Sequence, residues 1–270
     1  MSKHIAQTPK HPPSATGYLH DPARPILAHG RTMPAQSGIA PHHHPRAQLL
    51  WATAGVLRVT ASAETWIVPA SHAVWVPADM PHSVQSDTEV HIRNLYIDPS
   101  RPLRADNHSC AVLNLSDLMR ALILRLHRED TSGAFPPRLL RLCDVIADEI
   151  EALPQAPLHL PGGRDPRLLR ITRHLINHPD EARPLPELAR NAATSPRSLE
   201  RLFRQETGLS YRQWRARQRL LLAVERLSRG ESSATIAYAL GYRSPSAFTA
   251  AFRAAFGTPP QSFLKSETTP

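Results

Sequence analysis

The first half of the chain shows short apolar runs separated by residues that favour turns. Between residues 26 and 98 these runs are rich in β-branched and aromatic side chains, which predicts strands joined by tight connections. The expected strands are 48–53, 56–60, 65–69, 73–77, 82–86 and 89–98. Many short strands at such close spacing are typical of a sandwich or a small barrel.

After residue 115 the apolar positions recur at a helical period, which predicts amphipathic helices over 116–128 and 137–153. The apolar stripe of the second helix consists of Leu139, Leu142, Cys143, Ile146, Ile150 and Leu153. Such a stripe packs either on its own sheet or against the same helix of a second copy, and the pattern alone fits both. We expect a homodimer, with this helix as the candidate interface.

The second half of the chain contains a repeat between residues 183 and 263. From Ser195 and Ser244 onward the two copies superpose with a constant shift of 49 positions, which is hard to obtain by chance. Each copy predicts a short helix, a turn and a second helix that begins with a serine N-cap and a proline. Further helices are expected from Pro166 to about residue 177, before the repeat, and over 210–229, between its copies.

The second helix of each copy has one apolar stripe and one polar face. In the first copy the polar face carries Arg197, Arg201 and Arg204 at positions i, i+4 and i+7. Guanidinium groups on one exposed face suit phosphates and guanine edges. The corresponding face of the second copy is smaller and less charged, and consists of Ser246, Thr249 and Arg253, with Arg243 just before the helix.

The net charge of +9 lies entirely in the half that contains the repeat. Residues 164–270 hold 18 Lys and Arg against 9 Asp and Glu, whereas residues 1–163 hold 14 of each kind. A merely soluble basic surface does not explain this segregation. A polyanionic partner such as nucleic acid does.

Composition marks two segments outside the patterned regions. Residues 1–24 are rich in Pro and His and lack periodicity, which predicts a disordered arm. Residues 154–164 contain three prolines and two glycines, which predicts a linker. The expected fold is α+β with two domains: a β-barrel followed by helices over 25–153, and an all-helical domain over 165–266.

Targeting signals and cysteine chemistry add little to this interpretation. Cys110 and Cys143 are too few for a disulfide framework or a cysteine-rich metal site. The N-terminus lacks the apolar segment of a signal peptide, and no apolar run approaches the length of a membrane span. We expect a cytoplasmic protein without a membrane partner.

A known family pattern runs through residues 167–263. The residues that match it are Leu188, Ala189, Ser195, Pro196, Arg197, Ser198, Leu199, Leu202, Phe203, Gly208, Ile236, Ala237, the run 241–248, Phe252, the run 256–260 and Phe263. With them, this region closely resembles the DNA-binding domain of the AraC/XylS transcription regulators. The resemblance implies seven helices, with two helix-turn-helix units joined by a linker helix, whose recognition helices enter successive major grooves of double-stranded DNA.

The resemblance also implies a function and a set of contacts. The chain is expected to be a sequence-specific transcriptional regulator, either an activator or a repressor, with RNA polymerase as a partner if it activates. The residues expected to contact DNA are Arg197, Ser198, Arg201, Arg243, Ser246, Thr249 and Arg253. In such regulators an effector-binding and dimerising domain usually precedes the DNA-binding domain.

The first domain carries a histidine cluster with a recognisable spacing. His42, His44, Gln48 and Gly55 fall at the positions of the first cupin motif, and Pro77, Asp79 and His82 at those of the second. Residues 41–98 thus resemble the cupin-type sensor domain of such regulators, with Gln48 where cupins have Glu and Asp79 where they have Gly. The resemblance implies a divalent metal as a candidate cofactor, held by His42, His44 and His82.

The cluster has other interpretations. His42, His44, Gln48 and His82, together with Trp75, are candidates for a pocket that binds a small organic effector, or they rim the barrel without a ligand. A neutral amide is a poorer ligand for a divalent cation than a carboxylate, so Gln48 argues against a working dioxygenase. Arg46 and Arg93 are candidates to pair with an anionic effector, although lone arginines are more often surface residues.

The sequence therefore leaves three candidate functions for this protein. The first is a regulator with a cupin-like sensor, a dimerising helix and a DNA-binding domain with two helix-turn-helix units, and it is not an enzyme. The second is a metal-dependent cupin enzyme with a basic DNA-binding appendage, which Gln48 and the duplicated unit disfavour. The third is an architectural protein that binds DNA without sequence preference.

Overall fold

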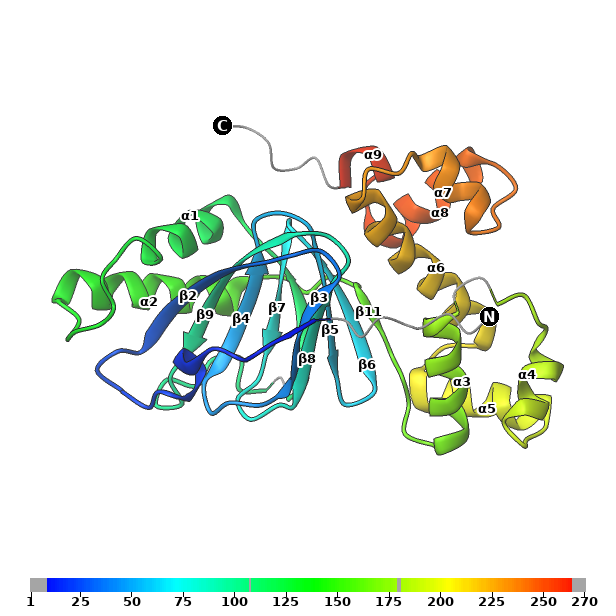
Figure 1. Cartoon of the computed structure of the whole chain (residues 1–270), viewed down its shortest axis with the longest axis horizontal. Helices are drawn as coiled ribbons and strands as arrows, with labels where there is room; N and C mark the ends of the chain where they lie inside the picture. The colour runs from blue at the N-terminus through cyan, green and yellow to red at the C-terminus, as the bar shows by residue number, and fades with distance from the viewer. Residues whose placement is uncertain (1–8, 107, 179–180, 264–270) are drawn as a thin grey trace. The chain divides into compact units, whose positions relative to one another are not determined.

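The computed structural model describes residues 9–106, 108–178 and 181–263, and its described part divides into two compact units (Figure 1). The first unit consists of residues 9–61 and 67–156, and the second of residues 62–66 and 157–263. The first unit is rich in strands and the second is helical, so the expected α+β class is confirmed. Within the described residues, no helix is long and apolar enough to cross a membrane.

Two sheets contain the described strands, which lie in the first unit except for residues 64–66 and 159–160. One contains six strands in the order β1-β3-β8-β5-β6-β11, and the other five in the order β10-β7-β4-β9-β2. The bounds are β1 Lys10–His11, β2 Ile26–Met33, β3 Ser37–His42, β4 Ala47–Ala52, β5 Val56–Ala61, β6 Glu64–Pro69, β7 His72–Val76, β8 His82–Ser86, β9 Val90–Ile97, β10 Ala111–Asn114 and β11 His159–Leu160. The described strands pair within these two sheets and do not close into the expected barrel.

The sequence prediction of strands is largely confirmed. Strand β8 coincides with its expected range, and β4 to β7 and β9 overlap theirs. Strands β2 and β3 lie within the region 26–98 predicted to be rich in strands, but were not among the six expected ranges. Strand β10 and the two-residue edge strands β1 and β11 were not expected either, and β11 lies inside the segment predicted to be a linker. Strands β1, β10 and β11 are too short for an alternating pattern to reveal them.

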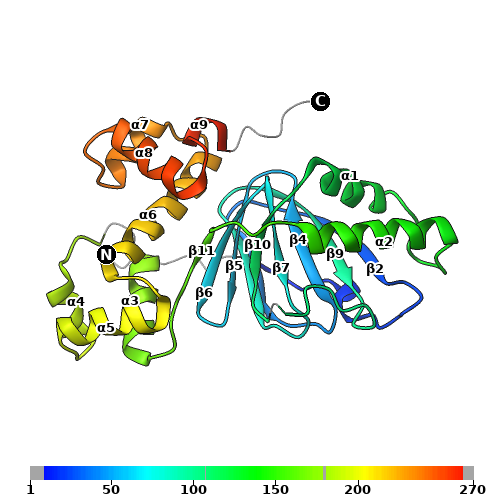
Figure 2. The same ribbon diagram turned by 180° about the vertical axis from the view of Figure 1, so that it is seen from behind.

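Two helices cover one face of the five-stranded sheet, α1 (Asp117–Leu126) and α2 (Pro137–Ala152), as Figure 2 shows. The apolar stripe of α2 packs into the same buried cluster as Leu49 and Trp75 of the sheet, and Ile146 is fully buried there. The stripe therefore serves the core of its own unit, and the expectation that it forms a dimer interface is wrong. Substituting Leu142 and Ile146 with Asp would damage this core instead of separating two copies.

The start of the chain is ordered where the structure describes it. Residues 1–8 of the expected disordered arm lie outside the described residues, but residues 9–24 form β1 and a 3-10 helix, η1 (Ala15–Tyr18). The buried Arg46 guanidinium holds this segment, since it donates hydrogen bonds to the carbonyls of Leu19 at 2.6 Å and Arg24 at 3.1 Å. It also forms an ion pair of 2.9 Å with Asp98. Arg46 is thus a structural residue and not the partner of an effector.

Seven helices make up the described part of the second unit, as the family resemblance implied. They are α3 Pro166–Asn177, α4 Leu185–Asn191, α5 Pro196–Thr207, α6 Tyr211–Ser228, α7 Ser233–Ala239, α8 Pro245–Phe256 and α9 Pro260–Phe263. Helices α5 and α8 start as predicted, because the Ser195 and Ser244 hydroxyls accept hydrogen bonds from the backbone N–H groups of Ser198 and Ala247. Both end at a left-handed glycine, Gly208 with φ of 71° and Gly257 with φ of 78°.

Candidate functional site

Helix α5 presents its arginines because its apolar stripe is fixed in the core. Leu199 and Phe203 are fully buried, and the Phe203 ring lies 5.7 Å from that of Trp214 on α6. The opposite face is therefore exposed, with Arg197 and Arg201 on it and Ser198 half-buried beside them. Arg204 is also exposed, and its Nε lies 3.4 Å from a carboxylate oxygen of Glu200, which is an intrahelical ion pair.

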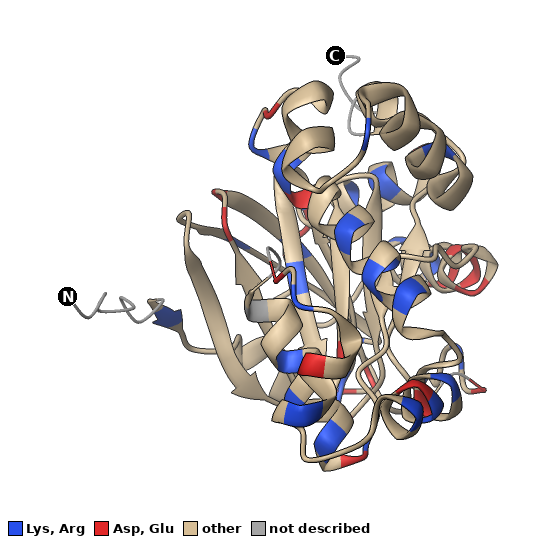
Figure 3. Ribbon diagram, turned by 90° about the vertical axis from the view of Figure 1, so that its right-hand side faces the viewer, with Lys and Arg blue, Asp and Glu red and all other residues tan. Residues whose placement is uncertain are grey.

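Helix α8 is held in the same way but has a different outer face. Phe248 and Phe252 are fully buried, and their rings lie 5.6 Å apart. The residues predicted to contact DNA lie outside this stripe: Arg243, Ser246 and Arg253 are exposed, and Thr249 is half-buried. Figure 3 shows the Lys and Arg positions along the helices of the second unit. Within α8, Arg253 is the single residue of this kind.

Helix α6 connects the two helix-turn-helix units, and part of its charge is structural. It begins with a reciprocal capping box between Ser210 and Gln213. Arg215 is buried, where it donates hydrogen bonds of 2.7 Å to the Gln218 side chain and to the Glu181 carbonyl. The sequence did not distinguish Arg215 from the other arginines of this helix, because burial of a charged group depends on tertiary partners.

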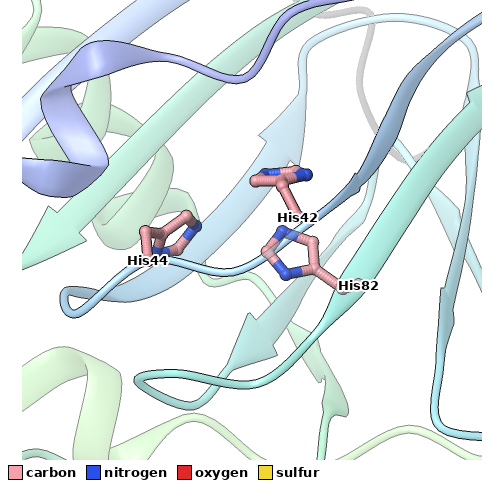
Figure 4. A group of neighbouring side chains, drawn as sticks. All are labelled: His42, His44 and His82. Carbon is pink, nitrogen blue, oxygen red and sulfur yellow. The ribbon is translucent and has the colours of Figure 1, made fainter.

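The three predicted metal-ligand histidines come together between the two sheets of the first unit (Figure 4). His42 ends β3 and His82 begins β8, and the two residues are paired across these antiparallel strands. His44 lies in the connection from β3 to β4. One ring nitrogen of each side chain lies within 4.8 Å of the others. The cupin-like spacing therefore predicted a real spatial cluster.

In all three histidine rings, Nδ1 donates a hydrogen bond to a backbone carbonyl. Nδ1 of His42 lies 2.8 Å from the Ala40 oxygen, and Nδ1 of His82 lies 2.9 Å from the Met80 oxygen. Nδ1 of His44 lies 2.6 Å from the Arg46 oxygen. A carbonyl only accepts, so each Nδ1 carries the proton and each neutral ring keeps a lone pair on Nε2.

Burial keeps these rings neutral. It lowers the pKa of His82 to about 4 and also lowers the pKa values of His42 and His44. Nε2 of His82 is buried and has no hydrogen-bond partner among the described residues. A buried polar atom without a partner is costly in a folded protein, so a water molecule or a ligand is expected at this nitrogen.

The contact between Gln48 and the histidine cluster brings two hydrogen-bond acceptors together. Its Oε1 lies 3.3 Å from Nε2 of His44, while its Nε2 lies 3.3 Å from the hydroxyl of Tyr96. Asn94 lies at the same hydroxyl, with its Nδ2 3.3 Å away. Because Nδ1 carries the His44 proton, both facing atoms, Nε2 of His44 and Oε1 of Gln48, are acceptors. Either a cation binds both atoms, or the side-chain amide of Gln48 is flipped, so that its NH2 group donates a hydrogen bond to Nε2 of His44.

Two residues of this site were missed by sequence reasoning, Tyr96 and Gly17. The Tyr96 ring lies 5.2 Å from the His44 ring in an edge-to-face arrangement. Gly17 of η1 lies so close to the cluster that a Cβ at this position would come within 2.9 Å of Cγ of His44. Neither contact leaves a local pattern, because each joins segments that are far apart in the sequence.

Trp75 does not join the histidines. It is 1% exposed and packs in the cluster under α1 and α2, on the other face of its sheet. There it lines a cavity of about 250 Å³ with Ile97, Leu103 and Arg104. The prediction that Trp75 belongs to the same pocket as His42, His44, Gln48 and His82 is therefore wrong.

Comparisons with known proteins agree in both units. A family model described as an AraC-like ligand binding domain matches residues 25–136, and a helix-turn-helix domain model matches residues 188–266. The HTH-type transcriptional regulator NimR of Escherichia coli (strain K12) is 34% identical over 250 residues, which is 93% of this chain and 90% of that protein. RipA of Corynebacterium glutamicum, another HTH-type transcriptional regulator, is 26% identical over 80% of this chain and 61% of that protein.

Among solved structures, ToxT from Vibrio cholerae is similar over 91% of this chain and 100% of that one. The identity is 13% and the TM-score 0.39, so this likeness has no bearing on ligand or function. The identity and coverage of NimR and the two matching domain models suffice to assign the family. The chain belongs to the AraC family of helix-turn-helix transcriptional regulators, with an N-terminal ligand-binding domain.

Proposed function

We propose that this regulator recognises one promoter site with both helix-turn-helix units, and that a small molecule bound in the first unit controls this recognition. The observation that carries the proposal is the matched pair of helices α5 and α8. Each is capped by a serine, buried along one stripe and accessible along the other. Two such helices joined by α6 suit successive major grooves of one DNA duplex.

The two helices have different roles in this proposal. On α5, Arg197 and Arg201 have the length and the paired donors to bind guanine O6 and N7, with Ser198 beside them. On α8, Ser246 and Thr249 are short and Arg253 is the main charged group. We therefore assign most base discrimination to α5, and assign to α8, with Arg243 before it, more of the contact with the DNA backbone and shape.

A homodimer is part of the proposal, although the apolar stripe of α2 does not form its interface. Large apolar side chains remain exposed on the helices of the first unit: Leu118 of α1 at 51% and Val145 of α2 at 44%. Neither belongs to the buried apolar cluster beneath these helices. Light scattering of the double variant Leu118→Glu, Val145→Glu tests the dimer. The measured mass should fall to half that of the wild type, while the helical content stays unchanged. Contact with RNA polymerase follows if the protein activates transcription.

The rival function, a metal-dependent cupin enzyme with a basic appendage, is favoured by one observation, the cluster of three imidazoles. The regulators among the relatives and the neutral Gln48 amide at the fourth position favour a binding site instead. Turnover of a substrate that ceases in a His82→Ala variant would support the enzyme.

Competition binding tests the proposed function. Labelled DNA from upstream of the protein's own gene is bound, and unlabelled copies of the same fragment or of a scrambled fragment compete for the protein at several salt concentrations. A specific regulator retains its preference for the true fragment while both affinities fall with salt. Equal competition by both fragments would instead indicate an architectural DNA binder.

A further inference from the structure

We propose that a cavity beneath the connection from β9 to β10 binds a small apolar carboxylate, and that this site is separate from the histidine cluster. The cavity has a volume of about 250 Å³ and lies against the five-stranded sheet. Ala47 of β4, Trp75 of β7 and Ile97 of β9 line it from the sheet, and Leu103 and Arg104 line it from the connection. All of these residues belong to the first unit.

The strand register places this cavity on the other face of the sheet from the histidines. Ala47 and Ile97 are paired across β4 and β9, so their side chains point to the same face. The neighbouring residues Gln48 and Tyr96 are also paired, and they point to the opposite face, where they contact His44. Successive side chains of both strands therefore serve two different sites.

The size and the walls of the cavity suit a small apolar molecule. An apolar cavity of about 150 Å³ is sufficient for benzene. A volume of about 250 Å³ therefore holds one ring with a short substituent, or a branched chain of similar size. Trp75, Ile97 and Leu103 supply the apolar surface. Pro102 and Ala105 also line the cavity and are exposed, so a small molecule can reach it from solvent.

The charges around the cavity leave one cation uncompensated. Asp98 lines the cavity, but its carboxylate already pairs with Arg46 at 2.9 Å. Arg101 also lines it, and its guanidinium pairs with Asp144 at 2.6 Å. The Arg104 guanidinium has no carboxylate partner among the described residues. The cavity therefore favours a ligand with a single negative charge.

Arg104 is held in place by the end of α2. Its NH1 donates hydrogen bonds to the carbonyls of Ile150 at 2.9 Å and Leu153 at 3.3 Å, while its Nε is buried without a hydrogen bond to the described residues. A guanidinium has five N–H donors, so others remain for a ligand. Arg104 also has a φ of 49°, a left-handed conformation that is uncommon outside glycine and recurs at ligand sites. Its fixed charge and remaining donors select a carboxylate as the polar group of the ligand.

The cavity gives the small molecule of the proposed function a site and a chemical class, and this step rests on that function. A ligand in the cavity lies between the sheet and Arg104, which holds the last turn of α2. The chain after α2 leads directly into the segment that joins the two units. Binding of the carboxylate therefore changes the affinity of the full chain for its promoter, and DNA changes the affinity for the carboxylate by the same factor.

The test is calorimetric titration of the full chain, without DNA, with phenylacetate and with phenylacetamide, which has a similar shape but no charge. Phenylacetate should bind at one site per chain, at least about tenfold more tightly than phenylacetamide, because the amide cannot form the ion pair with Arg104. Arg104→Gln should remove this difference between the two probes. Arg128, an exposed arginine of the same unit that does not line the cavity, provides the control. Arg128→Gln should leave both affinities unchanged within about twofold.

Ala47→Leu keeps the test valid if Arg104→Gln does not fold. Its larger side chain fills the cavity, so binding of both probes should be lost. Absence of saturable binding at millimolar phenylacetate, equal affinity for the two probes, or binding that survives in a folded Ala47→Leu chain would overturn the site. Binding at the cavity with an unchanged affinity for promoter DNA would overturn only the regulatory step. Loss of promoter preference in the competition assay would refute the proposed function and leave the carboxylate site standing.

Discussion

Replacing Trp214 with Phe should destabilise the second unit and leave the first unit unaffected. The Trp214 side chain is fully buried, and its indole Nε1 donates a hydrogen bond of 2.7 Å to the Pro161 carbonyl. Its ring also packs on Phe203 of α5, so it fixes the helix that carries Arg197 and Arg201. Phe keeps most of the apolar contact but loses the hydrogen bond and part of the volume.

The magnitude follows from these two losses. Leaving the buried Pro161 carbonyl without a donor costs about 1–3 kcal/mol. The missing ring volume, on the order of 40 Å³, adds about 1 kcal/mol at the measured cost of cavities. The free energy of unfolding of the second unit should therefore fall by about 2–4 kcal/mol, which for a unit of this size lowers its melting temperature by roughly 10–20 °C.

Trp51 is the matched control. It is 3% exposed, and its Nε1 donates a hydrogen bond of 2.7 Å to the Ala70 carbonyl in the first unit. Calorimetry of Trp214→Phe should show a lower transition for the helical unit only, with DNA binding lost at that temperature. Trp51→Phe should move the other transition. If both variants shift one common transition by similar amounts, the two units do not unfold independently, and the effect of Trp214 is not confined to the second unit.

Three further predictions concern single residues. Arg201→Ala should weaken binding to the correct site by about 1–3 kcal/mol and relax the preference at one base pair, measured by fluorescence titration with DNA. Arg173→Ala, on the exposed face of α3, is the control and should change neither the affinity nor the preference. Burial of His72 lowers its pKa from 6.5 to about 4, so the unfolded state binds more protons and stability falls as the pH drops through this window. This loss reaches about 3 kcal/mol and should largely vanish in His72→Gln on denaturant titration. Gly208→Ala and Gly257→Ala should each cost about 1–2 kcal/mol in thermal melts, since each φ is left-handed and no atom lies within 4 Å of the added Cβ.

Local signals in the sequence predicted the second unit well. The predicted caps at Ser195 and Ser244 each act within one turn of the chain, and the structure confirms them. The repeat also pairs Gly208 with Gly257, and the structure shows that both end their helices in the left-handed conformation. The repeat then indicated that both copies have the same core. The inward turn of Arg215 could not be predicted, because its partners lie on other elements.

The first unit was predicted less completely, since its site depends on which faces of the strands point inward. Strand β7 is buried at all five positions, because it lies between the other sheet and the helices. Without an alternating pattern, the sequence could not show that Trp75 faces away from the histidines. The spacing of His42, His44 and His82 was sufficient to predict their cluster. The presence of Tyr96 at the site could not be predicted, because it follows from the pairing of Gln48 with Tyr96 between β4 and β9.

The proposal that both recognition helices bind one promoter site is tested most directly by a hydroxyl-radical footprint on the DNA upstream of the protein's own gene. We expect two protected stretches about one helical turn apart, on one face of the duplex. An Arg197→Ala, Arg201→Ala chain should lose the protection that α5 gives before the protection that α8 gives. A single protected stretch, or protection spread evenly along the fragment, would show that α5 and α8 do not bind one site together.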